Sequence, residues 1–216
     1  MLSLTPFIDS QMRFPMKRKV LVFLSLTLAM TSSFAALKEG DSAPDFKTQA
    51  SLAGKEFTFS LQDALKKGPV VVYFYPAAFT GGCNLQAHTF AENHDKFAAA
   101  GASVIGVSLD SISRLNDFSA DPQYCAGKLP VASDEKGEIA KSYDIKIADT
   151  YKGQAVAKMK DSRGNEVGHS MAERTTFVVT PDHKIAATIG GVGGDANAEQ
   201  ALAVVQQLAA KRTARN

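Results

Sequence analysis

The sequence predicts an α/β domain in which a central mixed β-sheet is flanked by helices on both faces. Two observations carry this prediction. Apolar, strand-like runs alternate with helix-like segments through the first two thirds of the chain, a pattern typical of parallel strands joined by helices. A strand hairpin, residues 175–180 and 184–189, then precedes a last helical segment, so the sheet must also contain antiparallel strands.

The first elements are predicted from short local patterns. Residues 40–46 form a turn that leads into an edge segment, and residues 56–60 alternate as a strand does. Residues 61–67 are predicted to be helical and to stop at Gly68-Pro69. Residues 70–75 are a continuous apolar run, which is typical of a strand buried on both faces of a sheet.

A long helix is predicted over residues 83–100. The residues of one face recur at helical spacing, and they are Ala87, Phe90, Ala91, His94, Phe97 and Ala98. Gly101 is suited to end this helix, because glycine readily adopts the left-handed conformation found after helix ends. Residues 102–109 are predicted to form a second buried strand, and residues 112–120 a helix.

The second half of the chain is less regular. Asp121-Pro122 opens the segment that holds Cys125, and a short strand (129–132) and a helix (135–143) follow. Residues 144–172 are polar, with a hairpin turn at 162–165. Residues 191–196 match a dinucleotide-binding glycine pattern, but too little chain follows for that fold. We therefore expect a Gly-rich loop before a last helix, residues 197–212.

Residues 1–35 are predicted to be a signal peptide. Basic residues follow Met16, an apolar stretch covers residues 20–30, and Ser33-Phe34-Ala35 fits a cleavage site. The stretch is shorter than the roughly 20 residues that span a bilayer, although an uncleaved anchor is the alternative. We expect Met16 to be the true start, residues 36–216 to be the mature domain, and the protein to be exported to the periplasm rather than kept in the cytoplasm.

Size and charge exclude some classes of function. The chain has 216 residues and a formal net charge of +2, which indicates neither a nucleic-acid partner nor an acidic surface. A domain of this length buries a sizeable core without needing a disulfide. The basic residues 211–215 are interpreted as a helix end that complements the helix dipole.

Cys83 is the strongest candidate for a reactive group. It follows a buried strand and a short loop, and it stands at the start of a helix. The first N–H groups of a helix are unpaired and the dipole adds positive potential, so a thiolate is favoured there. The alternative is a buried structural cysteine. Because Gly81-Gly82 is predicted to be a turn, we expect Cys83 to be poorly placed for burial.

Cys125 is the only other cysteine. In an oxidising compartment the pair could form a permanent disulfide, and this alternative stays open. No C-x-x-C motif occurs, so a thioredoxin-type redox motif is absent. His88 and His94 are six apart on a helix and cannot form a metal pair, and His169 and His183 have no companion carboxylate spacing, so we expect each histidine to be exposed or satisfied.

Three motifs together resemble those of peroxiredoxins of the AhpC/TSA type. They are Pro76-x3-Thr80-x2-Cys83, Gly40-x2-Ala43-Pro44-Asp45-Phe46 and Arg174-Thr175-Thr176-Phe177. The resemblance covers nearly all of residues 37–210 and looks closest to the bacterioferritin comigratory protein, or Q-type, branch. It implies a thioredoxin-like fold and thiol-dependent reduction of hydrogen peroxide and small organic hydroperoxides, with no metal and no bound cofactor.

The resemblance also implies roles for single residues. Cys83 would be the peroxidatic cysteine, and Arg174 the cation beside its sulfur. Thr80 would bond the thiolate and the peroxide, while Pro76 would shield the pocket. Gln86 occupies a helix position where relatives have Glu or Gln. The plainer alternatives are a surface ion pair for Arg174 and an ordinary loop residue for Thr80.

The chain departs from this branch at the resolving cysteine. Many relatives carry it five residues after the first, where this chain has His88. Cys125 is then the candidate, in a segment before residues 129–134 that looks like the one after the family's third helix. The resemblance implies a thioredoxin-like or other dithiol reductant and a monomer or non-covalent dimer. Without a resolving role for Cys125, the enzyme would use one cysteine and an external thiol.

Acidity alone does not make a thiol a fast peroxidase. Lowering a cysteine pKa from about 8.5 to about 6 raises the ionised fraction at pH 7 roughly thirty-fold, from about 3%. Nucleophilicity falls roughly thirteen-fold over the same change, so the net gain is about two-fold. Donors must therefore stabilise the charge on the departing peroxide oxygen, and we expect Arg174 and Thr80 to supply them.

Two other functions remain open at this point. A general thiol–disulfide exchange protein of the same fold would reduce protein disulfides and show little peroxidase activity. A non-catalytic binding module would hold Cys83 and Cys125 in a permanent bridge.

Overall fold

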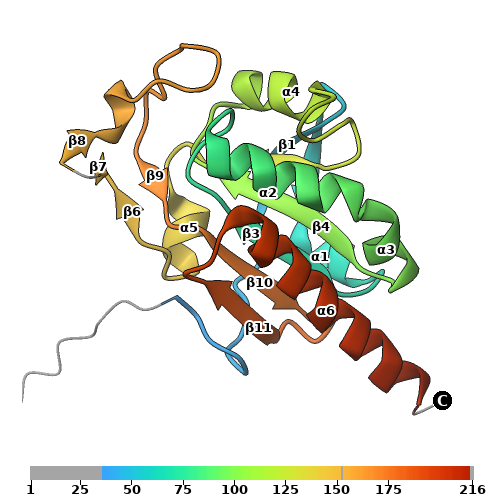
Figure 1. Cartoon of the computed structure of the whole chain (residues 1–216). Helices are drawn as coiled ribbons and strands as arrows, with labels where there is room; N and C mark the ends of the chain where they lie inside the picture. The colour runs from blue at the N-terminus through green and yellow to red at the C-terminus, as the bar shows by residue number, and fades with distance from the viewer. Residues whose placement is uncertain (1–35, 152, 215–216) are drawn as a thin grey trace, which may run out of the picture. The chain divides into compact units, whose positions relative to one another are not determined.

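The protein is described by a computed structural model that covers residues 36–151 and 153–214 (Figure 1). The predicted signal peptide, residues 1–35, and the expected start at Met16 lie outside the described residues. Within the described ranges, no helix is both long and apolar enough to cross a membrane.

Seven strands form one sheet. Their order is β11 (Ile185–Gly190), β10 (Thr175–Val179), β3 (Val70–Phe74), β4 (Ser103–Ser108), β5 (Val131–Ser133), β1 (Lys47–Leu52) and β2 (Lys55–Ser60). The three central neighbours β3, β4 and β5 run parallel, whereas the outer pairs are antiparallel. The mixed sheet predicted from the sequence is therefore confirmed.

Helices cover both faces of the sheet (Figure 1). One face carries α2 (Gly81–Glu92), α3 (His94–Ala99), α4 (Ile112–Ala120) and α6 (Gly194–Thr213), and the other carries α1 (Leu61–Leu65) and α5 (Glu138–Ser142). Short elements connect α5 to β10: β6 (Ile147–Ala148), β7 (Thr150–Tyr151), β8 (Gln154–Ala155), the 3-10 helix η1 (Val156–Lys158) and β9 (Met171–Ala172).

Strand β3 separates two hydrophobic clusters, because its side chains alternate between the faces of the sheet. Val71 and Tyr73 join the cluster beneath α2, α4 and α6, while the alternate residues join the cluster beneath α1 and α5. Every residue of β3 is buried, as its apolar run predicts. A slip of one residue would exchange the two sets of side chains, so burial fixes where the strand ends and the loop at Pro76 begins.

The first long helix predicted from the sequence is in fact two helices. Asn93 (φ −94°, ψ 7°) separates α2 from α3. The break rotates the turns that follow, so His94 and Ala98 are not buried, whereas Phe97 is. Gly101 follows α3 with φ +75°, which confirms it as the helix end.

Other boundaries also differ from the prediction. β1 lies where the sequence suggested only a turn and an edge segment, and α5 is shorter than residues 135–143. α6 begins at Gly194, inside the expected Gly-rich loop. A Cβ at Gly194 would lie 2.3 Å from the Gly82 carbonyl oxygen and 2.8 Å from Gln86 Cβ. The glycine therefore allows α6 to start against the first turn of α2.

Candidate active site

Thr80 caps the start of α2 through its backbone. It is extended (φ −108°, ψ 144°), and its carbonyl accepts the N–H groups of Cys83 and Asn84 at 2.9 and 2.8 Å. Its side chain does not cap the helix, because its hydroxyl donates to the carbonyl of Ala77 at 2.8 Å. The helix start therefore keeps its positive potential, and Cys83 lies within the first turn.

Cys83 is buried, and the expectation that it is poorly placed for burial is wrong. Gly81 and Gly82 are the first residues of α2 rather than a turn before it. The helix thus begins two residues before Cys83, and Cys83 is only 3% exposed, within the cluster beneath α2, α4 and α6. A thiol in purely apolar packing is inert, so its nearest polar neighbour decides what it can do.

That neighbour is Arg174, the residue before β10. Its Nη2 donates to Cys83 Sγ at 3.3 Å, so Arg174 is no surface ion-pair residue. Gly82 leaves room for the guanidinium, because a Cβ there would lie 3.2 Å from Nη2. The sulfur is therefore shielded from bulk water and faces a fixed positive charge, an arrangement in which an anionic sulfur is stabilised.

Gln86 holds the other arm of Arg174. Arg174 Nη1 donates to Gln86 Oε1, and Gln86 Nε2 donates to Asn197 Oδ1 at 2.8 Å. Thr176 also donates to Asn197 Oδ1, and Asn197 Nδ2 donates to the carbonyl of Ile189 at 3.1 Å. Gln86, Thr176 and Asn197 are fully buried. The guanidinium is thus positioned by a network that joins α2, β10, β11 and α6.

Sequence reasoning found Gln86 but missed Asn197 and Thr176. One signal was available for Thr176, because a threonine inside a strand that is otherwise apolar must find a hydrogen-bond partner when the strand is buried. Asn197 carries no such signal. The role of Asn197 can be recognised only when α6 packs against α2 and brings its side chain to Gln86.

Pro76 and Thr80 lie on the loop between β3 and α2, and both are partly buried. The hydroxyl hydrogen of Thr80 goes to Ala77 and not to the sulfur of Cys83. Its oxygen still has acceptor capacity, because a hydroxyl can accept as well as donate.

Cys125 lies in the turn after α4 and is fully buried, and its thiol, like that of Cys83, is free. Burial, and to a lesser degree the charge of Asp121, raises the pKa of the Cys125 thiol far above its usual range. Both cysteines share a cluster with Tyr73, whose pKa is raised by burial first and then by Cys125 and Cys83. Cys125 is therefore a neutral thiol in this state, and it becomes a nucleophile only if its segment opens.

One histidine has a carboxylate partner that the sequence did not indicate. His169 Nε2 lies 2.9 Å from Oδ1 of Asp110, a residue far away in the chain. His169 is therefore a satisfied histidine, as expected, although its carboxylate partner comes from a distant part of the chain. Across residues 36–151 and 153–214, no three His, Cys, Asp or Glu side chains are grouped so as to hold a metal ion.

Comparison with known proteins agrees with this geometry. The model of the AhpC/TSA family matches residues 40–188. A Mycobacterium tuberculosis relative that carries a peroxiredoxin name, MT1643, is 30% identical over 173 residues, which cover 80% of this chain and 98% of that protein. Chloroplastic peroxiredoxin Q of Sedum lineare is 37% identical over 123 residues, or 56% of this chain and 61% of that protein.

Solved structures show the same architecture. Peroxidoxin BcpB from Mycobacterium tuberculosis matches with a TM-score of 0.64 and 28% identity, over 79% of this chain and 97% of that one. A PrxQ mutant from Xylella fastidiosa matches with a TM-score of 0.62 and 25% identity, over 81% and 99%.

Fold and site together define a thiol peroxidase with a thioredoxin-like fold. The chain belongs to the AhpC/TSA family of peroxiredoxins, and its homologues include the Q-type. The resemblance seen in its motifs is therefore confirmed, and a general thiol–disulfide exchange protein is not favoured.

Proposed function

We propose that Cys83 is the peroxidatic cysteine. The observation that carries this proposal is the 3.3 Å hydrogen bond from Arg174 Nη2 to its sulfur. The thiolate attacks the nearer peroxide oxygen, so that an S–O bond forms while the O–O bond breaks. The departing oxygen takes the electron pair and gains a proton, giving water or an alcohol. Cys83 is left as a sulfenic acid.

Arg174 and Thr80 are proposed to act on the peroxide during this step. Gln86 already fixes the guanidinium of Arg174, so no reorganisation is needed when negative charge builds up on the departing oxygen. The Thr80 oxygen accepts a hydrogen bond from the peroxide, because its own hydrogen is engaged by Ala77. Pro76 shields the site from water at the start of the same loop.

Arg174→Ala is expected to slow the oxidation of Cys83 by about 10²–10³-fold, which is the usual cost of removing a donor to a developing oxyanion. The rate should be measured by rapid quench at a pH where ultraviolet absorbance shows Cys83 to be fully ionised. Arg174→Lys should recover only part of the rate, because lysine cannot contact Cys83 and Gln86 with two fixed arms. If fully ionised Arg174→Ala reacts as fast as the wild type, Arg174 is not a catalytic donor.

Cys125 is proposed to resolve the sulfenic acid within the same chain. Its thiolate attacks Cys83 Sγ, an S–S bond forms, and the hydroxyl leaves as water with the proton that Cys125 gave up. The buried Cys125 thiol is neutral and must become a thiolate to attack, and a disulfide requires Cα atoms within about 7 Å, so we propose that the segments that carry the two cysteines open first. Ala126 (φ +51°) and Gly127 (φ +66°) form a tight turn where residues 121–128 can open.

One equivalent of hydrogen peroxide should therefore remove both thiols of the wild type, but only one thiol of Cys125→Ser. Cys83→Ser should keep its thiol over the same time. Thiols are counted after denaturation, with intact mass to identify the disulfide. The oxidised wild type should also exchange amide hydrogens faster in residues 121–128 than the reduced protein. A wild type that keeps the Cys125 thiol would be a one-cysteine enzyme, and unchanged exchange would contradict the opening.

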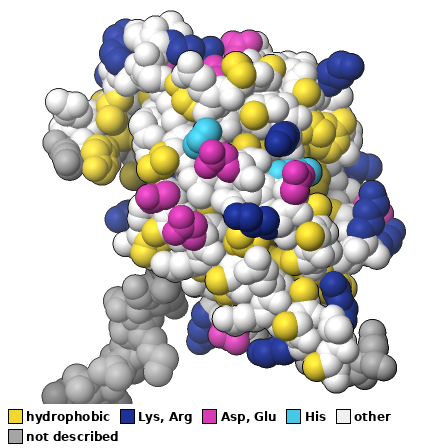
Figure 2. Space-filling model, turned by 45° about the vertical axis from the view of Figure 1, so that its right-hand side comes forward, with side chains coloured by type: hydrophobic (Ala, Val, Ile, Leu, Met, Phe, Trp, Pro, Cys, Tyr) yellow, Lys and Arg dark blue, Asp and Glu magenta, His cyan; other side chains and the backbone are white. Residues whose placement is uncertain are grey.

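Membership of the family implies a hydroperoxide substrate and a thioredoxin-type reductant. We propose that this dithiol protein attacks the Cys83–Cys125 disulfide and restores both thiols. We propose further that the enzyme is a monomer or a non-covalent dimer and has no nucleic-acid partner. The face drawn in Figure 2 supports the last point, because acidic and basic side chains are interspersed on it and no basic patch stands out.

We also propose that residues 1–35 are a cleaved signal peptide and that the enzyme works in the periplasm. The support is the order of basic, apolar and small residues in that stretch. The reductant would then have to be an exported dithiol protein. N-terminal sequencing of the protein recovered from a periplasmic fraction should begin at Ala36. Recovery of the intact N-terminus from the cytoplasm would contradict this proposal.

A further inference from the structure

A polar cluster centred on Asp110 is tied to the active-site loop, residues 76–80. Asp110 lies just after β4 and is fully buried. Its Oδ2 accepts the backbone N–H of Ala78 at 2.8 Å and the hydroxyl of Ser108 at 2.7 Å. Since Ala78 lies between Pro76 and Thr80, this carboxylate helps to set where the loop runs.

Arg114, on α4, binds the other backbone polar group of Ala78, which is its carbonyl. Its Nη2 donates to the carbonyl of Ala78 at 3.0 Å and to Asp161 Oδ2 at 2.8 Å. Its Nε lies 2.9 Å from Asp110 Oδ1. Both backbone polar groups of Ala78 are thus bound by side chains of one ion-pair cluster.

The segment after η1 holds the next residue of the loop, Phe79. The N–H of Ser162 donates to the Phe79 carbonyl at 2.8 Å, and the guanidinium carbon of Arg163 lies 3.3 Å from the centre of the Phe79 ring. Phe79 has φ +61°, which is rare for a bulky residue and persists only where surrounding contacts impose it. A shift of the cluster would therefore be passed along the loop to Thr80.

His169 completes the cluster, and both of its ring nitrogens face acceptors. Nε2 lies 2.9 Å from Asp110 Oδ1, and Nδ1 lies 2.7 Å from the carbonyl oxygen of Ser170. A carboxylate and a carbonyl only accept, so both contacts are hydrogen bonds only when the ring carries two protons.

The electrostatics of the cluster favour that doubly protonated ring. Burial alone would lower the pKa of His169, but the hydrogen bond and charge of Asp110 outweigh burial and raise the pKa above its ordinary value. Below about pH 6.5 the ring is protonated, and the proton is lost as the pH rises through the raised pKa.

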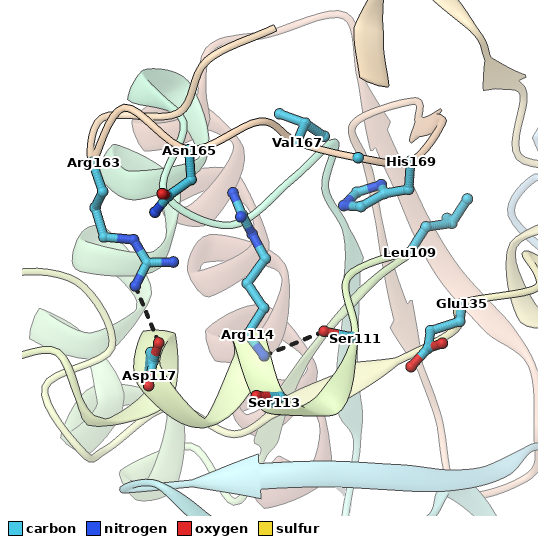
Figure 3. A pocket seen from close by; sticks show the side chains of 11 residues that line it. Leu109, Ser111, Ser113, Arg114, Asp117, Glu135, Arg163, Asn165, Val167 and His169 are labelled. Carbon is cyan, nitrogen blue, oxygen red and sulfur yellow. Dashed lines mark hydrogen bonds and ion pairs between the residues drawn. The ribbon is translucent and has the colours of Figure 1, made fainter. Parts of the chain in front are cut away.

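His169 meets solvent in a pocket of about 490 Å³ (Figure 3). Its side chain is 18% exposed there. The other charged residues that line the pocket are Arg114, Arg163, Asp117 and Glu135. Tyr75, which follows β3, also interacts with the carboxylate of Asp110. Burial, and then the charge of Asp110, raises the pKa of Tyr75. Among these residue types only histidine ordinarily titrates between about pH 6 and 9.

We propose that Asp110, Arg114 and His169 form a positioning unit that holds Pro76 and Thr80 in the geometry for peroxide attack only while His169 is protonated. The proposal rests on the proposed role of Cys83. When the proton is lost, the ring can donate to only one of its two acceptors, and the positive charge that faces the buried carboxylate of Asp110 disappears. The carboxylate is then balanced by Arg114 and no longer by the ring, so it moves away from the ring, and because it also holds the N–H of Ala78, the loop shifts with it. A misplacement well below 1 Å is enough to cost about ten-fold in rate.

The test measures oxidation of Cys83 by hydrogen peroxide in the full chain carrying Cys125→Ser, so that the reaction stops at the sulfenic acid. Rates from about pH 6 to about pH 9 are divided by the thiolate fraction read from ultraviolet absorbance at each pH. With His169 present, the rate per thiolate should fall about ten-fold as the pH rises. With His169→Gln it should be flat and should meet the first curve at high pH.

His94→Gln is the matched control, because His94 also lies 3.1 Å from a carboxylate, that of Asp95, but at the surface of α3. It should keep the falling profile. A His169→Gln curve that falls in parallel with the unmodified curve would overturn the proposal, since a merely structural change lowers the rate at every pH. If Cys83 is not oxidised at any pH, the proposed function itself fails, and this inference fails with it.

Discussion

The guanidinium of Arg174 bridges Cys83 Sγ and Gln86 Oε1, and the chemistry of the site depends on this bridge. A cysteine that is 3% exposed would otherwise be a structural residue of the core. Because one arm is held by a fully buried amide, the other arm stays against the sulfur without any change of rotamer. The site therefore keeps charge stabilisation in place before the peroxide arrives, where it is worth far more than in water.

Two separate parts of the fold hold the reacting groups. Packing of α6 against α2, which the absence of a side chain at Gly194 allows, brings Asn197 to Gln86 and so fixes Arg174. On the other side, Asp110 and Arg114 hold the loop that carries Thr80. Both supports converge where the parallel strands β3 and β4 end, which is the edge of an α/β sheet where functional loops usually gather. The guanidinium of Arg174 and the loop of Thr80 are thus held by separate sets of side chains.

Much of this could be predicted from the sequence, because it depends on local patterns. The apolar run of β3, the hairpin of β10 and β11, and the cysteine at a helix start follow from periodicity and turn residues. The pairing of Cys83 with Arg174 came only from a resemblance of motifs. Asn197 and Asp110 could not be found, because their partners lie far away in the chain and a lone polar residue does not show whether it will be buried. The burial of Cys83 was missed because two glycines looked like a turn, whereas the helix begins with them.

The most direct test of the bridge is a double-mutant cycle on the rate of Cys83 oxidation, with Gln86→Ala, Arg174→Ala and the two combined. Gln86 is held to act only through Arg174. Gln86→Ala should therefore slow the reaction on its own, yet add nothing once Arg174 is gone, so that the double variant matches Arg174→Ala. If the two effects multiply, or if Gln86→Ala leaves the rate unchanged, the guanidinium is not positioned by this network and the account of the site is wrong.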